Sequence, residues 1–490
     1  SSTPTNHRSL YFRLKSSVMS HFVQKFGGTS LGTAERMKGV AQIIVDHLKQ
    51  YHRVTAVVSA MSSYNKAEGT TSRLLEAGNL ALSGGPFYRM IDLVEESHNE
   101  AFSKAVRNPE IQEQLREFVH RELRSLKSFL EAIHVIREIS PRSQDLIVGT
   151  GERLSARLLS GVLQDLGIDA EYVDLSEALP EGEHAPEGRA LFPYLQHQFK
   201  QYLPQETGRT AVITGFFGFV PGGIIDRVGR GYTDLTAALI AAETKADELQ
   251  VWKEVDGIYS ADPRKVPTAS VLPEISPAEA AELTYFGSEV LHPFTMECAI
   301  KANVPIRIKN TFHPEKPGTI IVPGKLTEQR RQRNQTAVAV TTKHHVSILN
   351  IHSNRMLNST GFMAQVFELF KKHRVVIDLI STSEVNISCT VDRVDNIQSL
   401  IHDMEEFADV TLIRDRAILS LVGEGMHYAT GTAGRMFMAL AQQQINLEMI
   451  TQGASEINIS CVIRQEDAPE ALRVIHQTFL ESNTGTNASS

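Results

Sequence analysis

Two glycine-rich segments of this chain carry residues that could bind a phosphorylated ligand. The first, Lys25-Phe26-Gly27-Gly28-Thr29-Ser30, follows a short apolar run and precedes a segment with helical periodicity that starts at Thr33. Glycines at such a turn let backbone N–H groups approach a ligand, a helix N-terminus favours an anion, and a lysine adds a charge suited to phosphate. An ordinary strand-to-helix turn with a surface lysine has the same pattern, so this segment alone leaves both interpretations open.

The second segment is Gly229-Arg230-Gly231-Tyr232-Thr233-Asp234, which precedes an apolar helix expected from Leu235 to Ala246. Thr233 or Asp234 is suited to be the N-cap of that helix, which is the simplest interpretation of either residue. The segment nevertheless repeats the features of the first one, with a cation and glycines at a helix N-terminus. Two anion-binding turns in one α/β domain arise by accident less often than one, so the pair favours a phosphate-binding site.

Two further polar groups are candidates for the same site. Glu152 lies in Gly149-Thr150-Gly151-Glu152-Arg153, where we expect a helix to begin. A carboxylate in the first turn stabilises a helix in its own right, so Glu152 is equally well interpreted as a capping residue or as a substrate contact. The loop from Lys253 to Arg264 follows an apolar strand, and open α/β sheets bind ligands beyond the carboxyl ends of their strands.

The chemistry indicated is phosphoryl transfer. The sequence lacks GxxxxGK[ST] and HRDxxxxN, and no GxGxxG opens the first helix. It also shows no Ser-His-Asp spacing and no cluster of metal-binding histidines. Phosphoryl transfer needs mainly positioning and charge neutralisation, which lysine, backbone N–H groups and Mg²⁺ supply. A carboxylate acceptor, already ionised at neutral pH, would require no general base.

The elements that position these residues alternate between strands and helices. Short apolar runs typical of buried strands end near residues 24, 58, 173, 214, 252 and 308, with helical patterns between them. This alternation predicts an α/β fold with a mostly parallel sheet between layers of helices. The stretch from Arg73 to Leu130 is helical and highly charged, and it contains no recognisable chemistry.

Composition narrows the class of protein. The chain has 490 residues, a hydrophobic content of 42%, a charged content of 22% and a formal net charge of -8. These values indicate a globular protein of two to four domains, and they argue against a nucleic-acid binder. No apolar run is long enough to cross a membrane. The three cysteines, Cys298, Cys389 and Cys461, are too few for a disulfide framework and fit a reducing compartment such as the cytoplasm.

The C-terminal part contains an internal repeat. Ile377-Asp378-Leu379-Ile380-Ser381-Thr382 leads to Asn386-Ile387-Ser388-Cys389, and Leu447-Glu448-Met449-Ile450-Thr451-Gln452 leads to Asn458-Ile459-Ser460-Cys461. Each copy has an apolar strand before it and a helical segment between, which predicts two small ferredoxin-like βαββαβ units. Two short units would bury their exposed sheet faces by pairing, which favours a role in regulation or dimerisation.

Six motifs in this order resemble those of the aspartate kinases. They are KFGGTS from Lys25, VVSAMS from Val57, GERLSAR from Gly151, GRGYTD from Gly229, VDGIYSADPR from Val255 and FGSEVLHP from Phe286. The resemblance covers about residues 20–465 and is nearest to the monofunctional fungal branch. It implies an amino-acid kinase fold with tandem C-terminal ACT domains. The expected organisation is a disordered tail (1–20), a catalytic domain (21–325), a linker that includes the first strand of the second ACT unit (326–343), two ACT domains (344–410 and 411–480) and a tail (481–490).

The activity implied is Mg-ATP-dependent phosphorylation of the side-chain carboxylate of L-aspartate, the entry step to threonine and methionine, and in some organisms lysine. Lys25 and Asp234 would be catalytic, with Asp234 orienting Lys25 or the metal. The aspartate-binding residues would be Ser59, Thr71, Glu152, Phe216, Arg230 and Thr233. Arg230 would bind the α-carboxylate and Glu152 the ammonium group.

The cofactors implied are ATP and Mg²⁺, with no metal ligands assigned in the chain. The ATP-binding residues would be Lys25, Gly27, Gly28, Ser30, Ala60, Lys253, Glu254, Tyr259, Asp262 and Arg264. One position departs from the family pattern, because Glu289 stands where many relatives carry a lysine near the nucleotide. Lys253, Arg264 or Lys265 would then supply the second cation.

Feedback control by an amino acid is also implied. The effector-binding residues would be Met356, Ser359, Gly361, Phe362, Met363, Ile377, Asp378, Thr382, Ser383 and Glu384, with Asp378 binding the effector's ammonium group. Threonine fits the resemblance best and lysine second. The ACT units would join copies of the chain into a dimer or larger homo-oligomer, and residues Thr336 to Thr341 would supply a strand to the second unit.

Two other functions fit parts of the sequence. One is a kinase of the same fold that acts on glutamate, acetylglutamate or a nucleotide, although such relatives usually lack a tandem ACT tail. The other is an amino-acid sensor without catalytic activity. The presence of Lys25, Glu152, Arg230 and Asp234 together argues against that sensor.

Overall fold

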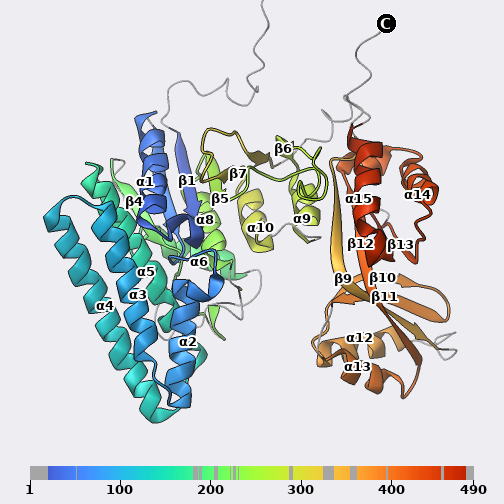
Figure 1. Cartoon of the computed structure of the whole chain (residues 1–490), viewed down its shortest axis with the longest axis horizontal. Coiled ribbons are helices and arrows are strands. Elements are labelled where there is room, and N and C mark those ends of the chain that lie inside the picture. The colour runs from blue at the N-terminus through green and yellow to red at the C-terminus, as the bar shows by residue number, and fades with distance from the viewer. Residues whose placement is uncertain are drawn as a thin grey trace, which may run out of the picture. The chain divides into compact units, whose positions relative to one another are not determined.

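The chain divides into two units. The computed structural model describes residues 20–50, 52–179, 186, 190–203, 208–220, 222–224, 228–229, 231–285, 291–323, 336–353, 361–392, 396–453 and 457–481. The first unit comprises the chain up to Asp256 together with Leu291–Ile320, and the second comprises Gly257–Val290 and the chain from Ile321 (Figure 1). The segment expected to link the catalytic and ACT domains, 326–343, lies partly outside the described residues.

A parallel sheet forms the centre of the first unit, with the strand order β3-β4-β2-β1-β5-β7. The strands are β1 (His21–Phe26), β2 (Arg53–Val58), β3 (Ala170–Val173), β4 (Thr210–Thr214), β5 (Glu248–Lys253) and β7 (Ile306–Asn310). All neighbouring pairs run parallel. Strands β1, β2 and β4 are buried along nearly their whole length, as a sheet covered on both faces requires. The predicted fold class is thereby confirmed.

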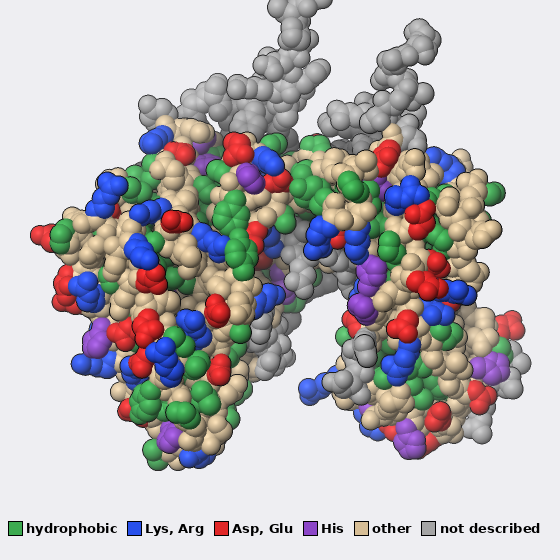
Figure 2. Space-filling view, in the orientation of Figure 1, with side chains coloured by type: hydrophobic (Ala, Val, Ile, Leu, Met, Phe, Trp, Pro, Cys, Tyr) green, Lys and Arg blue, Asp and Glu red, His purple; other side chains and the backbone are tan. Residues whose placement is uncertain are grey.

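Helices pack on this sheet and on one another. They are α1 (Ala34–Lys49), α2 (Thr70–Ser83), α3 (Tyr88–Ala105), α4 (Pro109–Ile136), α5 (Pro141–Asp165), α6 (Leu191–Lys200), α8 (Tyr232–Glu243) and α10 (Pro293–Lys301). The stretch expected to be helical from Arg73 contains α2, α3 and α4, which pack on α5. Helix α4 buries Leu115, Val119, Leu126 and Leu130 along one face, so it joins the core through helical periodicity. Acidic and basic side chains are interspersed over the outer surface of α3 and α4 (Figure 2).

Two local expectations were wrong. Helix α5 begins at Pro141 and not at Gly149, so Glu152 lies in its middle and caps nothing. Helix α8 begins at Tyr232 with Gly231 as its N-cap, so neither Thr233 nor Asp234 is the cap. In the first glycine segment, a 3₁₀ turn (Gly28–Leu31) precedes α1, and Thr33 is the N-cap of that helix, in agreement with the helical periodicity expected from Thr33.

The second unit contains a six-stranded antiparallel sheet with the order β10-β11-β9-β12-β14-β13. Its strands are β9 (Ala339–His352), β10 (Ile377–Thr382), β11 (Asn386–Asp392), β12 (Asp409–Val422), β13 (Met449–Thr451) and β14 (Asn458–Arg464), and its helices are α12 (Phe362–Lys372), α13 (Ile397–Met404), α14 (Thr432–Gln442) and α15 (Ala468–His476). The unit also contains β6 (Glu274–Ile275) and α9 (Pro277–Tyr285), and β8 (Thr319–Ile321) straddles the division of the chain.

Strands β9 and β12 each run through both copies of the sequence repeat. The first repeat uses residues 346–352 of β9 and 409–413 of β12, with α12, β10, β11 and α13. The second repeat uses residues 339–343 of β9 and 416–422 of β12, with α14, β13, β14 and α15. His345 and Asp415 interrupt the two strands with positive φ angles of 60° and 59°. The strand expected from Thr336 to Thr341 belongs to β9 only from Ala339 onward, and there it pairs with the second repeat. In the part of the chain that the structure describes, no helix is long and apolar enough to cross a membrane.

Candidate functional site

The predicted catalytic residues lie at one edge of the parallel sheet. Strands β1, β2, β4 and β5 run in the same direction, so their carboxyl ends meet at this edge. Lys25 is the second-last residue of β1 and lies between Val57 of β2 and Val251 of β5. Helix α8 begins at the same edge. The two glycine-rich segments are thereby brought together, although about 200 residues separate them in sequence.

Lys25 and Asp234 form a buried ion pair. Nζ of Lys25 lies 2.6 Å from Oδ1 of Asp234, and the side chains are 10% and 9% exposed. Burial alone would raise the pKa of Asp234, but the charges of Lys25 and Lys253 hold this pKa below its ordinary value. Asp234 therefore stays ionised and fixes the Lys25 ammonium group at the sheet edge. A lysine held in this way is prepared to meet a phosphate without rearranging.

The glycines near Lys25 differ in the space that surrounds them. A Cβ on Gly28 would lie 2.3 Å from the carbonyl oxygen of Ala60, and one on Gly32 would lie 1.8 Å from that of Ser62. The segment after β2 packs too closely on this turn for any side chain there. A Cβ on Gly27 would meet only Nζ of Lys25, 3.9 Å away. Of these glycines, Gly27 is the one with room in front of it for a ligand.

Ser30 connects the glycine turn to the end of β5. The hydroxyl of Thr311 donates to the carbonyl oxygen of Lys253 at 3.0 Å, and the hydroxyls of Ser30 and Thr311 are 3.0 Å apart. Since Thr311 uses its own proton for Lys253, Ser30 is the donor of the second bond. Ser30 is buried, so its hydroxyl holds this edge together. Thr311 was not predicted, and nothing in its local sequence marks it.

Glu152 is buried and bonded to the start of α8. The hydroxyl of Tyr232 donates a hydrogen bond to Oε1 of Glu152, and only 2% of the residue is exposed. Burial raises the pKa of Glu152 to about 7, although hydrogen bonds from Tyr232 and from the backbone of Ala60 oppose the rise. A buried carboxylate with this pKa is suited to bind a ligand cation, which would restore its ordinary ionisation.

Close packing places Glu152 beside the other predicted residues. A Cβ on Gly149 would lie 2.4 Å from the ring of Phe216, and one on Gly151 would lie 2.7 Å from Cβ of Ala60. Phe216 in turn contacts Tyr232 edge to face, with ring centroids 6.4 Å apart. The two glycines before Glu152 therefore bring α5 against the ends of β2 and β4.

The remaining predicted aspartate-binding residues are Ser59, Thr233, Thr71 and Arg230. The carbonyl oxygen of Ser59 accepts a hydrogen bond from the hydroxyl of Ser155 on α5, at 2.7 Å. Thr233 is buried in the first turn of α8, where it packs against Gly215. Thr71 is half-buried in the first turn of α2. Arg230 lies outside the described residues, as does Glu289.

His292 belongs to this site but received no role in the prediction. A Cβ on Gly231 would lie 2.8 Å from Cδ2 of His292, so the imidazole covers the N-terminus of α8. Burial lowers the pKa of His292, while the charge of Asp234 and the backbone of Val228 oppose this effect. His292 stands inside the FGSEVLHP motif, and that position was the signal available in the sequence.

The predicted nucleotide segment is divided between the two units. Lys253 and Glu254 belong to the first unit, whereas Tyr259, Asp262 and Arg264 belong to the second. Arg264 is 87% exposed and binds Asp262, with Nη2 of the arginine 2.9 Å from Oδ2. Their contact lowers the pKa of Asp262. The Arg264 charge is therefore balanced within its own turn, whereas Lys253 acts electrostatically on Asp234.

The predicted effector residues that are described lie on α12 and β10 of the first repeat. Gly361 is the N-cap of α12, Phe362 is buried and Met363 is 37% exposed. Ile377, Asp378 and Thr382 belong to β10, and Ser383 and Glu384 follow it. Met356 and Ser359 lie outside the described residues.

The side chain of Asp378 is 2% exposed and binds Lys343, whose Nζ is 2.8 Å from Asp378 and 2.9 Å from Asp392. Burial would lower the pKa of Lys343, but its hydrogen bonds to these two carboxylates raise it. The predicted effector-binding carboxylate is thus already bound to a cation of the chain itself.

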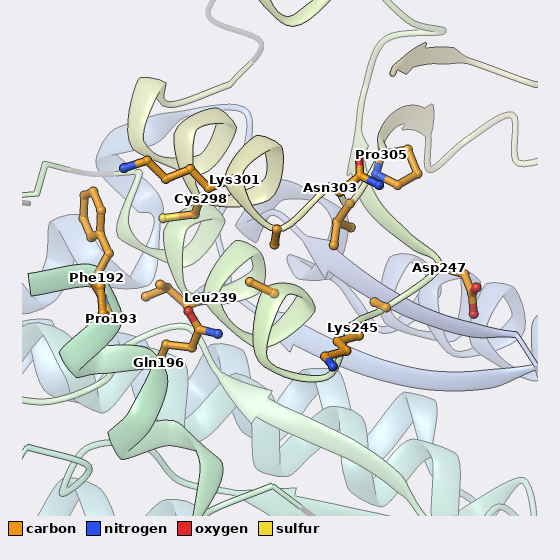
Figure 3. A pocket seen from close by; sticks show the side chains of 14 residues that line it. Phe192, Pro193, Gln196, Leu239, Lys245, Asp247, Cys298, Lys301, Asn303 and Pro305 are labelled. Carbon is orange, nitrogen blue, oxygen red and sulfur yellow. The ribbon is translucent and has the colours of Figure 1, made fainter. Parts of the chain in front are cut away.

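A separate cavity of about 620 Å³ opens in the first unit (Figure 3). It is lined by residues of α6, α8 and α10, with Phe192, Leu239 and Cys298 among them, and by Asn303 and Pro305 ahead of β7. Asp247 and Pro305 precede β5 and β7, so this cavity adjoins the amino ends of these strands. None of the predicted site residues lines it.

Comparison with known proteins gives matches over nearly the whole chain. The amino acid kinase family matches residues 21–310, and the ACT domain matches residues 349–401 and 419–479. The aspartokinase of Schizosaccharomyces pombe is 44% identical over 485 residues, which covers 94% of this chain and 92% of the relative. That of Saccharomyces cerevisiae is 43% identical, covering 97% and 96%.

Solved structures are similar in fold as well. Escherichia coli aspartokinase III in complex with aspartate and ADP is 28% identical, with a TM-score of 0.72, and the match covers 93% of this chain and 99% of that one. The same enzyme in complex with lysine and aspartate gives a TM-score of 0.74 at 28% identity, with coverage of 94% and 99%.

Proposed function

Because the chain belongs to the aspartokinase family and is an aspartate kinase, we propose that it transfers the γ-phosphoryl group of Mg-ATP to the side-chain carboxylate of L-aspartate. The product would be 4-phospho-L-aspartate. The observation that carries this proposal is the buried Lys25–Asp234 pair at the carboxyl edge of the sheet, with the Glu152 carboxylate held nearby through Tyr232.

Each charged group of this edge has a task in that reaction. Lys25 neutralises the negative charge that develops on the transferred phosphoryl group, and Asp234 keeps the ammonium group in place. Glu152 binds the ammonium group of aspartate and Arg230 its α-carboxylate. The acceptor carboxylate is ionised at neutral pH, so none of the described side chains has to remove a proton from it.

We expect ATP to bind together with Mg²⁺. In the part of the chain that the structure describes, no group of three or more His, Cys, Asp or Glu side chains is placed to hold a metal. Mg²⁺ commonly binds proteins through one or two carboxylates and the phosphates of its substrate, and Asp234 is suited to such a contact. Bound Mg²⁺ would neutralise phosphate charge. Gly27 leaves room for the phosphates beside Lys25, and Lys253 adds a second cation.

The proposal is tested by trapping the acyl phosphate with hydroxylamine in the presence of ATP, Mg²⁺ and one acceptor at a time. Aspartate should give hydroxamate, whereas glutamate and acetylglutamate should give little. Turnover with an acceptor other than aspartate would assign the chain to a different substrate, and ATP binding without turnover on any acceptor would indicate a sensor.

We further propose feedback inhibition by threonine at the first repeat, with lysine as the second candidate. The support is the place of Gly361, Met363 and Asp378 on two consecutive elements of an ACT unit. An effector's ammonium group would have to replace Lys343 at Asp378. Asp378→Ala should abolish inhibition while turnover persists, and a threonine-sensitive Asp378→Ala variant would overturn this assignment.

The chain is proposed to assemble through its ACT units into a dimer or larger homo-oligomer. Strand β10 lies at one end of the six-stranded sheet, and Ile380 on it and Met363 on α12 are both exposed apolar side chains. Light scattering on the intact chain tests this state. We place the enzyme in the cytoplasm, because its three cysteines are free and buried.

A further inference from the structure

A second buried carboxylate lies on the face of α5 that carries Glu152. Asp145 is 1% exposed and precedes Glu152 by seven residues, so the two side chains are two helical turns, or about 10 Å, apart along one face. Ser140, and not Asp145, is the N-cap of α5. A carboxylate buried in this way loses its hydration and needs hydrogen-bond donors within the protein.

Asp145 binds the backbone of the segment that leads into α8. Both oxygens of its carboxylate lie 3.0 Å from the backbone nitrogen of Ile224, which is itself fully buried. The carbonyl oxygen of Ile224 accepts from the N–H groups of Val228 at 2.9 Å and of Gly229 at 3.2 Å. Asp145 therefore fixes the start of a turn whose other end is the first glycine of the second glycine-rich segment.

The same segment returns to α5 at Tyr232. Gly229 has a positive φ of 86°, a conformation that favours glycine, and Gly231 is the N-cap from which α8 begins. Tyr232 is the first residue of α8, is 4% exposed and donates a hydrogen bond to Glu152. One face of α5 thus holds this segment at both ends, first through Asp145 and then through Glu152.

The two carboxylates also act on Tyr232 electrostatically. Burial raises the pKa of Tyr232, and the charges of Glu152 and Asp145 raise it further. The phenol therefore keeps its proton and remains a hydrogen-bond donor. Its bond opposes the rise that burial causes in the pKa of Glu152. The ionisation of Glu152 therefore depends on where Tyr232 is held.

We propose that Asp145 is a positioning residue for binding of the acceptor amino acid. By holding the N–H of Ile224 it sets the place of Tyr232, and Tyr232 in turn supports the ionised form of Glu152. The proposal rests on the proposed function, in which Glu152 binds the ammonium group of aspartate. All four residues belong to the first unit. Loss of the Asp145 carboxylate should therefore weaken aspartate binding and leave ATP binding nearly unchanged.

A matched control is present at the other end of α5. The carboxylate of Asp165 accepts from the backbone N–H groups of Arg107 at 3.0 Å and of Asn108 at 2.8 Å. The contact is of the same kind, because a carboxylate of α5 holds the backbone of another segment. That segment leads into α4 and not into α8. Asp165→Ala therefore removes a comparable bond without affecting the start of α8.

The experiment compares five variants of the full chain. Asp145→Ala removes the carboxylate, whereas Asp145→Asn keeps an oxygen that can accept from Ile224. Tyr232→Phe removes the hydroxyl that binds Glu152. The double variant Asp145→Ala/Tyr232→Phe tests whether the first residue acts through the second, and Asp165→Ala is the control. The measurements are kcat, KM for aspartate and KM for ATP in the hydroxylamine assay.

We expect Asp145→Ala to raise KM for aspartate about three- to tenfold, the range of one lost hydrogen bond. KM for ATP should change less than about twofold, since Lys25 and Asp234 still bind each other. Asp145→Asn should stay within about threefold of the wild type in KM for aspartate. In the Tyr232→Phe background, Asp145→Ala should add less than about twofold, because the bond it supports is already absent.

Additive effects in the double variant, equal rises in both KM values, or an equal effect of Asp165→Ala would overturn the proposal. Should Asp145→Ala fail to fold, the cycle is run with Asp145→Asn, which weakens the bond to Ile224 by removing the charge. Its effect of about two- to threefold should likewise vanish in the Tyr232→Phe background. A wild-type chain without aspartate-dependent turnover would instead refute the proposed function, which the same assay shows separately.

Discussion

The hydroxyl of Tyr232 donates a hydrogen bond to the Glu152 carboxylate and joins the first turn of α8 to the middle of α5. These helices carry the second glycine segment and the GERLSAR motif, which lie about 80 residues apart in sequence. The bond supports the ionised form of a carboxylate whose burial favours the protonated form. The proposed binding of aspartate therefore depends on protonation at this position.

Measuring aspartate binding at several pH values tests this role of Glu152. Since the pKa of Glu152 is raised to about 7, its ionised fraction grows roughly tenfold between pH 6 and pH 8. KM for aspartate should fall by about the same factor over this range. Glu152→Gln should raise KM about 100-fold and remove the dependence. Initial rates at several aspartate concentrations and pH values measure both, and an unchanged profile in Glu152→Gln would contradict the assignment.

The buried Glu152 carboxylate should also lower the free energy of unfolding of the ligand-free protein. A folded-state pKa above the unfolded value means that the folded chain binds the proton more tightly, so the free energy of unfolding falls as pH rises from about 4.5 through 7. Glu152→Gln should therefore be more stable than the wild type by roughly 1–3 kcal/mol at pH 8, with the difference vanishing near pH 4. Urea unfolding at both pH values checks this sign.

Loss of the Lys25 charge should remove turnover. In Lys25→Met, the developing phosphoryl charge lacks its cation, and kcat should fall about 10³-fold or more. The variant also leaves Asp234 buried without its nearest partner, which should cost about 2–4 kcal/mol of stability. Adding Asp234→Asn should recover much of that stability without restoring turnover. Lys127→Met, which breaks a surface pair with Asp92, is the control and should change little.

Removal of Lys343 should sensitise the enzyme to its effector. Lys343→Met would free the Asp378 carboxylate, so the threonine concentration for half-inhibition should fall, by about tenfold if the competition amounts to 1.4 kcal/mol. Lys372→Met breaks a surface pair with Asp403 in the same repeat and should leave inhibition unchanged. Threonine inhibition curves for the wild type, Lys343→Met and Lys372→Met measure these effects. Reduced sensitivity in Lys343→Met would mean that Lys343 helps to bind the effector.

Substitution of Gly149 should destabilise the fold because its surroundings are closely packed. A methyl group there would lie 2.4 Å from the Phe216 ring, so Gly149→Ala should destabilise the fold by about 1–3 kcal/mol. Gly39→Ala on α1 has open space and should instead stabilise by about 0.5–1 kcal/mol. Thermal unfolding of both variants measures the contrast, and equal melting temperatures would argue against close packing at Gly149.

The fold was predictable because its signals are local. Apolar runs of strand length, helical periodicity and a repeated segment can all be recognised within short windows, and the sheet and the two repeats follow from them. The start of α5 was missed because Gly149 and Gly151 look like a turn. These positions are glycine because they contact Phe216 and Ala60, which follow strands β4 and β2.

The candidate site was predictable only in part for the same reason. Lys25, Asp234 and Glu152 stand in motifs, so their sequence context marks them. Thr311 and the covering position of His292 arise from strands and helices brought together in three dimensions. The cation beside Asp378 could not be foreseen either, because Lys343 precedes the first repeat and reaches it through β9.

The long strands β9 and β12 make the ACT tandem a single folding unit. Each strand supplies the middle of the sheet to both repeats, so unfolding of either repeat would remove central hydrogen bonds from the other. The tandem should therefore melt in one cooperative transition, and no cut between the repeats would release an intact module. Because the sheet is shared, a mutation that destabilises one repeat should also destabilise the other.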